Sequence, residues 1–274
     1  MPCIRSWLPT PVELPWEYES VAYHYDSQAG PRYASFPMTG LLPINIVEPE
    51  DLIKASSPLW ITYLEPEDGI GTLDTKGDKT YRFSLPPSFE EYIEQLDYDA
   101  RKEMRYVLRK NADLLVIENQ KEDLLAVCDD HFRTIRERCI AEGETPFSLE
   151  GIELLKRIYR TDACTTLSFI DPVSSMLLGV NVSFRRKGIV YDSVCMRPVP
   201  ELAKKRSLGT FAILKNIEVA IREKQCIYDM LVGEWGYKPK FGAKPVAMRH
   251  IIHSSRGFAT AYGIPLCDVD RLEE

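Results

Sequence analysis

The stretch Ile227–Ala243, IYDMLVGEWGYKPKFGA, begins as a β-strand and ends in a polar, aromatic and cationic turn. Its first half has the apolar composition of a buried strand, but Asp229 interrupts that run and a glycine ends it. A strand that only fills a core does not need a carboxylate in its middle. We therefore expect the strand to stop at the mouth of a functional site, with Glu234, Tyr237 and Lys238 crowded just beyond it.

The rest of the C-terminal two thirds alternates between helical and β-type patterns. A helical pattern starts at Ser88, a plausible N-cap, and is expected to break near residues 97–99. Further helices are predicted at 121–141, 148–160 and 208–224, and β-type runs at 114–118, 164–171, 176–185, 189–196, 226–233 and 246–253. The polar stretch 197–206 is expected to be a loop. This order predicts an α+β fold with a mixed central sheet flanked by helices.

The distribution of proline divides the chain into two regions. Twelve of its nineteen prolines lie in residues 1–87, where short extended pieces such as PLWITYLEP and TYRFSLPP alternate with loops. We therefore expect an irregular N-terminal segment at 1–87, a boundary near residue 87 and the main domain at 88–274.

The amino-acid composition argues against several classes of function. Acidic residues outnumber basic ones 41 to 34, a formal charge of −7, which argues against a protein that coats nucleic acid. The seven cysteines include no Cys-x-x-Cys pair, and His250 and His253 would face opposite sides of a strand, so no metal is expected. With neither a signal-peptide pattern nor a long apolar run, we expect a soluble, cytoplasmic protein with no membrane partner.

The predicted helix at 208–224 begins beside three cations. Backbone N–H groups and the positive end of the dipole make a helix start an anion site, and a glycine allows close approach. The alternative is a simple N-cap with solvated cations. The residues that would bind the anion are Lys204, Lys205, Arg206, Ser207, Leu208, Gly209 and Thr210.

A second basic feature follows the first long helix. Arg101, Arg105 and Arg109 recur every fourth residue and so share one face. The face is either solvated or a binding surface for an anionic substrate.

The stretch at 83–111, FSLPPSFEEYIEQLDYDARKEMRYVLRKN, resembles the entry to GNAT-fold acyltransferases of the BioF2-like or CelD-like group, which are related to the Fem peptidyltransferases. Members continue with a small-residue helix start, a strand with Asp, and a glycine followed by Tyr-Lys and an aromatic residue. This chain has the same order over roughly residues 80–250. The matching positions are Ser207-Leu208-Gly209, Asp229, Gly233, Tyr237-Lys238 and Phe241-Gly242.

The resemblance implies a GNAT-like fold in which the strands at 189–196 and 226–233 splay apart to admit an acyl donor. It implies an N-acyltransferase that moves an acyl group to a small-molecule or peptide amine by direct attack. Asp229 is then the candidate base, with Asp192 and Glu234 as competitors. Tyr237 or Lys238 would bind a carboxylate or phosphate, or polarise the carbonyl.

Three functions stay open under this resemblance. The acidic composition favours acyl-CoA, or an acyl carrier, as the donor. The second is an aminoacyl-tRNA-dependent transferase of Fem or arginyltransferase type, with charged tRNA as partner. The third is a catalytically idle GNAT-like binding module, because Phe211 stands where the wider GNAT pyrophosphate loop has a small residue. The N-terminal segment would be a degenerate GNAT half, and the oligomeric state is left open.

Overall fold

The structure is a computed structural model that describes residues 22–27, 30–35, 59–64, 74–143, 152, 156, 159–160, 164–186, 188–232 and 236–253. The chain divides into two compact units, residues 81–244 and the remainder. The division crosses strands β4 (Asp74–Ser84) and β10 (Lys244–His253). The smaller unit takes in β10 because that strand pairs with β3, which lies far from it in the sequence. The expected boundary near residue 87 stays a prediction.

The smaller unit is built from β-strands where it is described. Strand β1 (Ala22–Ser27) pairs antiparallel with β2 (Gly30–Ser35), which pairs parallel with β3 (Leu59–Leu64). Strand β3 pairs antiparallel with β10. The extended pieces predicted at PLWITYLEP and TYRFSLPP are thus confirmed as β3 and β4. The degenerate GNAT half stays a prediction.

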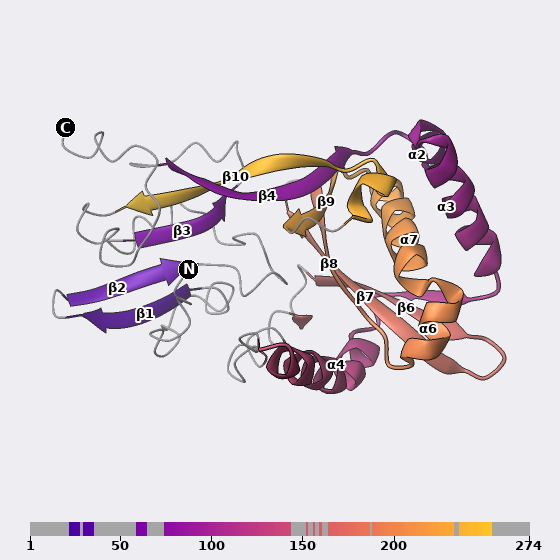
Figure 1. Cartoon of the computed structure of the whole chain (residues 1–274), viewed down its shortest axis with the longest axis horizontal. Coiled ribbons are helices and arrows are strands. Elements are labelled where there is room, and N and C mark those ends of the chain that lie inside the picture. The colour runs from indigo at the N-terminus through magenta and orange to yellow at the C-terminus, as the bar shows by residue number, and fades with distance from the viewer. Residues whose placement is uncertain are drawn as a thin grey trace. The chain divides into compact units, whose positions relative to one another are not determined.

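The larger unit contains a mixed sheet with the strand order β4-β9-β8-β7-β6-β5 (Figure 1). An antiparallel meander joins β5 to β8, and β8 pairs parallel with β9. The strands are β5 (Leu115–Glu118), β6 (Cys164–Asp171), β7 (Met176–Arg186), β8 (Ile189–Met196) and β9 (Ile227–Val232). The α+β prediction with a mixed central sheet is confirmed.

The first helical stretch is two helices, as predicted. In α2 (Phe89–Gln95) the Ser88 side chain accepts a hydrogen bond from the Glu91 N–H, and α3 (Tyr98–Lys110) starts after Asp97. Helix α7 (Leu208–Arg222) packs on strands β7 and β8 and against α3. Helix α4 (Lys121–Ala141) covers the opposite face of the sheet (Figure 1).

One prediction of local structure is wrong. The stretch expected as a polar loop forms helix α6 (Pro200–Arg206), which runs almost directly into α7. Pro200 occupies the first helical turn, where its missing N–H is not needed, and three cations lie in the last turn, where they oppose the negative end of the dipole. The buried amide of Asn111 ties α6 to α3 by donating to the Arg206 carbonyl at 2.8 Å.

The core of the larger unit lies between α7, α2, α3 and the sheet. Its α7 face is almost wholly apolar and includes Leu208, Phe211, Leu214 and Ile217, each at most 3% exposed. Gly179 of β7 lets α7 approach closely, because a Cβ there would lie 2.8 Å from Leu208 Cδ2. The start of α7 is thereby fixed against the ends of β7 and β8.

Candidate active site

Strands β8 and β9 separate at a defined point. Their parallel ladder joins Ile189–Tyr191 to Ile227–Asp229. Strand β8 continues to Met196 paired with β7, and no further pairing to β9 is present among the described residues of either strand. We call this point the fork and define it by Tyr191, Asp192, Asp229, Leu231 and Lys238.

Two backbone irregularities accompany the fork. The register between β7 and β8 shifts between Val182 and Ser183, so β8 carries an extra residue just after Asp192. On the other strand Leu231 has φ +66, a left-handed conformation that a branched side chain rarely adopts. Both distortions turn the strands away from regular pairing where the resemblance implied a splay.

Asp229 is buried and ion-paired. Its Oδ2 lies 2.8 Å from Nη2 of Arg82 on β4 and accepts a hydrogen bond from Arg82 Nε at 3.0 Å. Its Oδ1 accepts from the N–H of Leu231 at 2.7 Å, which holds the left-handed turn in place. Both oxygens are engaged and the side chain is only 1% exposed, so Asp229 is suited to fixing the fork rather than to receiving a proton from a substrate.

Asp192 differs because the residue is half-buried and its carboxylate is held by neutral amides rather than by an arginine. Its Oδ1 accepts hydrogen bonds from the side-chain amides of Asn181 at 3.0 Å and Asn216 at 3.2 Å. Burial raises the pKa of Asp192, while these amides, the Tyr228 hydroxyl and the Lys238 ammonium oppose that shift. A carboxylate with a raised pKa that is held by neutral amides is a better candidate base than Asp229, which is paired with an arginine.

Lys238 lies at the fork, at the start of the short 3-10 helix η2 (Lys238–Phe241). Its Nζ donates to the Leu231 carbonyl at 2.7 Å and lies 5.1 Å from the centre of the Tyr81 ring. Burial lowers the pKa of Lys238 to about 8, and Asp229 and Asp192 act in the opposite direction. Lys238 is a buried cation, since it is only 1% exposed.

Tyr237 lies beside Lys238 with its ring 45% exposed and packed edge-on against Phe241. Burial raises the pKa of Tyr237 to about 12, and the Asp192 charge adds to the shift. Tyr237 is thus a protonated hydroxyl at the rim of the fork. Glu234 lies outside the described residues.

The predicted anion site at the start of α7 is only partly assembled. Lys204 and Lys205 are exposed on the last turn of α6, and Arg206 forms a two-point pair with Asp113 at 2.8 and 2.9 Å. Leu208 is fully buried in the core.

The arrangement of the other residues at the start of α7 does not test whether an anion binds there, so the anion site stays a prediction. Ser207 has left-handed dihedral angles and makes no side-chain cap, and Gly209 and Thr210 are half-buried. Nη1 of Arg197, which follows β8, lies 3.9 Å from where a Cβ of Gly209 would be. Arg197 is therefore an additional cation for this site.

The arginines of α3 divide into two groups. Arg101 and Arg105 both pair with Glu94, and Arg101 also donates to the Leu96 carbonyl at 3.1 Å. Arg109 is exposed near the end of the helix. The positive charge of this arginine face of α3 is therefore partly neutralised at the N-terminal end of the helix.

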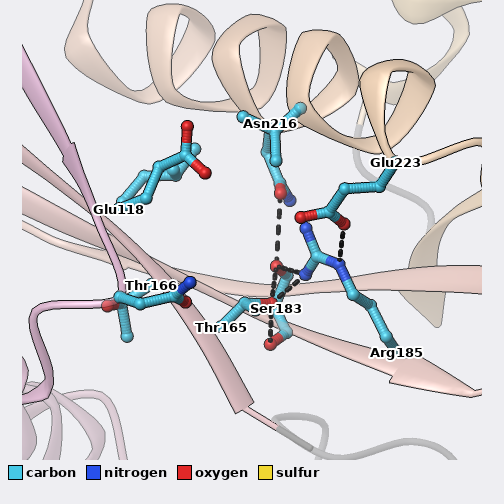
Figure 2. Close-up of a pocket in the computed structure, with 10 residues that line it drawn as sticks. Glu118, Thr165, Thr166, Ser183, Arg185, Asn216 and Glu223 are labelled. Atoms are coloured by element: carbon cyan, nitrogen blue, oxygen red, sulfur yellow. Dashed lines mark hydrogen bonds and ion pairs between the residues drawn. The ribbon is translucent and has the colours of Figure 1, made fainter.

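A small pocket lined mainly by polar residues lies between α7 and strands β5, β6 and β7 (Figure 2). It adjoins the fork, because its lining residue Ser183 is the strand partner of Asp192. Arg185 crosses it, pairing with Glu223 and donating to Ser183 Oγ at 3.0 Å and to Thr165 Oγ1. Ser183 Oγ in turn lies 3.2 Å from the side-chain oxygen of Asn216. The pocket wall is thereby linked to the residue that contacts Asp192.

Four residues of this region escape prediction from the sequence. Arg82, Arg197 and Tyr228 have no local pattern that marks them, because their partners are distant in the chain. Asn216 does carry a signal: it is a polar residue on the apolar face of a predicted helix, where an unsatisfied amide is costly.

Two features are absent from the described residues. In that part of the chain no cluster of three or more His, Cys, Asp or Glu side chains could hold a metal ion. Among its helices none is both long and apolar enough to cross a membrane.

Comparison with known proteins gives structural likeness only. No protein-family model and no curated protein sequence matches the chain. FemX is similar in structure, with a TM-score of 0.57 at 8% identity over 88% of this chain and 85% of that chain. L-PGS from Bacillus licheniformis has a TM-score of 0.52 at 10% identity, over 89% and 84%.

A third similar structure is the C-terminal domain (DUF2156) of a protein described as a lysylphosphatidylglycerol synthetase from Agrobacterium fabrum. Its TM-score is 0.51 at 11% identity, over 89% of this chain and 84% of that chain. Together with the strand order and the parting of β8 and β9, these likenesses show that the chain shares the fold of FemX and L-PGS, as the resemblance to Fem-related transferases implied.

Proposed function

We propose that this chain is an acyltransferase that moves an acyl or aminoacyl group from an activated carrier to an amine. The observation that carries the proposal is the fork, where two parallel strands part between the Asp192 carboxylate and the buried cation of Lys238. Where the two strands separate, their backbone N–H and C=O groups no longer pair with each other, and a substrate can bind to them. The carboxylate and the cation are the charges that aminolysis of an ester or thioester requires.

In the proposed reaction, the amine nitrogen attacks the carbonyl carbon of the donor. A C–N bond forms, the C–S or C–O bond to the carrier breaks, and the carrier leaves as a thiol or hydroxyl after protonation. Asp192 receives the proton that the attacking nitrogen loses, which its raised pKa favours. Holding the nitrogen and the carbonyl together supplies most of the rate.

Lys238 and Asp229 have supporting roles in this scheme. The Lys238 ammonium lies 2.7 Å from the Leu231 carbonyl in the turn of β9, where it stabilises negative charge developing on the substrate carbonyl. Asp229 and Arg82 keep β9 in its turned conformation. The protonated hydroxyl of Tyr237 at the rim is a further hydrogen-bond donor to the donor or acceptor.

The first candidate donor is acyl-CoA or an acyl carrier. The first turn of α7 has no acidic residue, Gly209 is open toward Arg197, and Lys204 and Lys205 are exposed on the adjoining turn of α6. This combination fits the phosphate groups of a pantetheine-bearing carrier.

The second candidate donor is aminoacyl-tRNA, and helix α3 favours it. The exposed side of α3 combines basic groups with two tyrosines, Tyr98 at 75% and Tyr106 at 53% exposure, and Lys110 lies over the Tyr106 ring. Cations with interspersed aromatic rings suit RNA phosphates and bases. The structures of FemX and L-PGS resemble this chain at TM-scores above 0.5.

Transfer assays with both donors test the proposal. Purified chain is incubated with radiolabelled acetyl-CoA or with tRNA charged with labelled amino acid, together with a panel of amines, and labelled amide is measured. We expect label transfer from one donor that Asp192→Asn abolishes. Arg109→Gln should lower transfer only if tRNA is the donor, whereas Arg197→Gln should lower transfer from acetyl-CoA. Donor binding with no amide formed by either donor would refute the transferase and leave the idle binding module.

A further inference from the structure

Asn216 is a buried amide on the apolar face of α7. It is 0% exposed and lies within one turn of Ala212, Ile217 and Ala220, all buried. An amide in such a place destabilises the fold unless its donors and acceptor are satisfied. Its amide forms hydrogen bonds with Asp192, with Tyr228 and with Ser183.

The contacts of Asn216 fix its orientation. Its Nδ2 donates to Asp192 Oδ1 at 3.2 Å and to the Tyr228 hydroxyl at 2.9 Å. Its Oδ1 accepts from the Ser183 hydroxyl at 3.2 Å. A flipped amide would place its oxygen against an ionised carboxylate, which can only accept, so one orientation is selected.

A chain of donors continues from Asn216 to the pocket of Figure 2. Arg185 Nη1 donates to Ser183 Oγ at 3.0 Å, and the Arg185 guanidinium is held by Glu223 and Thr165. Each bond therefore points the same way, from the Arg185 cation through Ser183 and Asn216 to Asp192. Bonds aligned in this way polarise one another and strengthen the last one.

We propose that Asn216 is a positioning residue that orients the Asp192 carboxylate at the fork, and that Ser183 and Arg185 lock the Asn216 amide for that task. The role in transfer rests on the proposed function, but the orientation of Asp192 does not. The arrangement explains why an apolar helix face carries one amide, and why an ion-paired arginine crosses the pocket next to the fork.

The proposal predicts how Asp192 titrates. Asn216→Leu removes a hydrogen bond that favours the ionised form, so the Asp192 pKa should rise by about one unit. Ser183→Ala should raise it less, because the Asn216 amide is loosened but present. The other titratable groups that act on Asp192, namely Lys238, Tyr228, Tyr237 and Cys195, are unchanged in both variants.

The test is a carbon-13 NMR titration of the aspartate carboxyl groups in the substrate-free chain, with the Asp192 signal assigned from Asp192→Asn. Thr166→Val is the matched control, since Thr166 lines the same pocket and is 1% exposed, but its hydroxyl makes no hydrogen bond in the structure. We expect the upward shift in Asn216→Leu and Ser183→Ala and no shift in Thr166→Val.

An unchanged Asp192 pKa in folded Ser183→Ala and Asn216→Leu would overturn the proposal and make Asn216 a core residue only. If Asn216→Leu does not fold, an unshifted Ser183→Ala overturns it alone. The titration needs no substrate, so a shift in a chain that transfers nothing would support the positioning role while the proposed function fails.

Discussion

Replacing Lys238 by Met distinguishes two contributions to the free energy of unfolding: the cost of burying a charge and the loss of a hydrogen bond. Methionine matches the length and apolar stem of lysine but removes the ammonium, which is 1% exposed and bonded to the Leu231 carbonyl. The lysine pKa is 10.5 in the unfolded reference and about 8 in the folded chain. Between these values the unfolded chain binds more protons, so the stability of the wild type rises with pH relative to the variant.

The size of this effect follows from the two pKa values. Between pH 7 and pH 9.5 the Lys238 contribution to the free energy of unfolding increases by about 2 kcal/mol, because one pKa unit corresponds to about 1.4 kcal/mol. Changes in packing are the same at both values of pH and cancel in the difference, and the effect of the proton on the bond to Leu231 is already contained in the folded pKa. Titrations of other groups cancel between wild type and variant.

Urea unfolding of both proteins at pH 7 and pH 9.5, followed by circular dichroism, measures this double difference. We expect the wild type to gain about 2 kcal/mol on the Lys238→Met variant as the pH rises. Lys240→Met is the control, because Lys240 is exposed and pairs with Glu103 on the surface. An unchanged gap between wild type and Lys238→Met would show that Lys238 is solvated and would remove the buried cation from the fork.

The other predictions concern Asp192, the Arg82 pair and the packing of α7. Asp192→Asn should lower the transfer rate by about 10²–10⁴-fold without loss of fold. Because burial raises the Asp192 pKa, wild-type activity should fall as the pH drops through that raised value. Equal rates for wild type and variant would exclude Asp192 as the base. Arg82→Met should destabilise the chain by about 3–5 kcal/mol by leaving Asp229 buried without its partner, whereas Arg105→Met, at a surface pair, should cost at most about 1 kcal/mol; similar losses in urea unfolding would contradict the structural role of Arg82. Gly179→Ala should cost about 1–3 kcal/mol, because its Cβ would lie 2.8 Å from Leu208 and 3.0 Å from the Met196 carbonyl, while Gly209→Ala should be neutral or stabilising; a melting temperature unchanged in Gly179→Ala would show that α7 is not fixed there.

Local patterns in the sequence predicted most of the larger unit. Helix α4 falls on the predicted residues, α2 and α3 break near Asp97, and the meander strands match their β-type runs. These features depend on periodicity and capping within a few residues. The exception is α6, which was expected as a loop because residues 197–206 contain two prolines and several cations, although Pro200 favours a helix start.

The candidate site was predicted only as a set of residue types. The sequence pointed to Asp229, Asp192, Tyr237 and Lys238, but it could not rank the two carboxylates. Their ranking depends on Arg82, which engages Asp229 from β4, and on the neutral amides that hold Asp192. Such contacts between residues far apart in the chain leave no local signal. The partner of Arg206, Asp113, was missed for the same reason.

The fork is best tested by a crystal structure with a bound donor analogue, either an acyl-CoA with a non-hydrolysable thioether or an amide-linked aminoacyl-adenosine. The account predicts that the carbonyl group lies between the separated ends of β8 and β9, with Asp192 on one side and Lys238 on the other, and that the ladder still ends at Tyr191 and Asp229. A donor bound elsewhere, with both strands fully paired past those two residues, would contradict it.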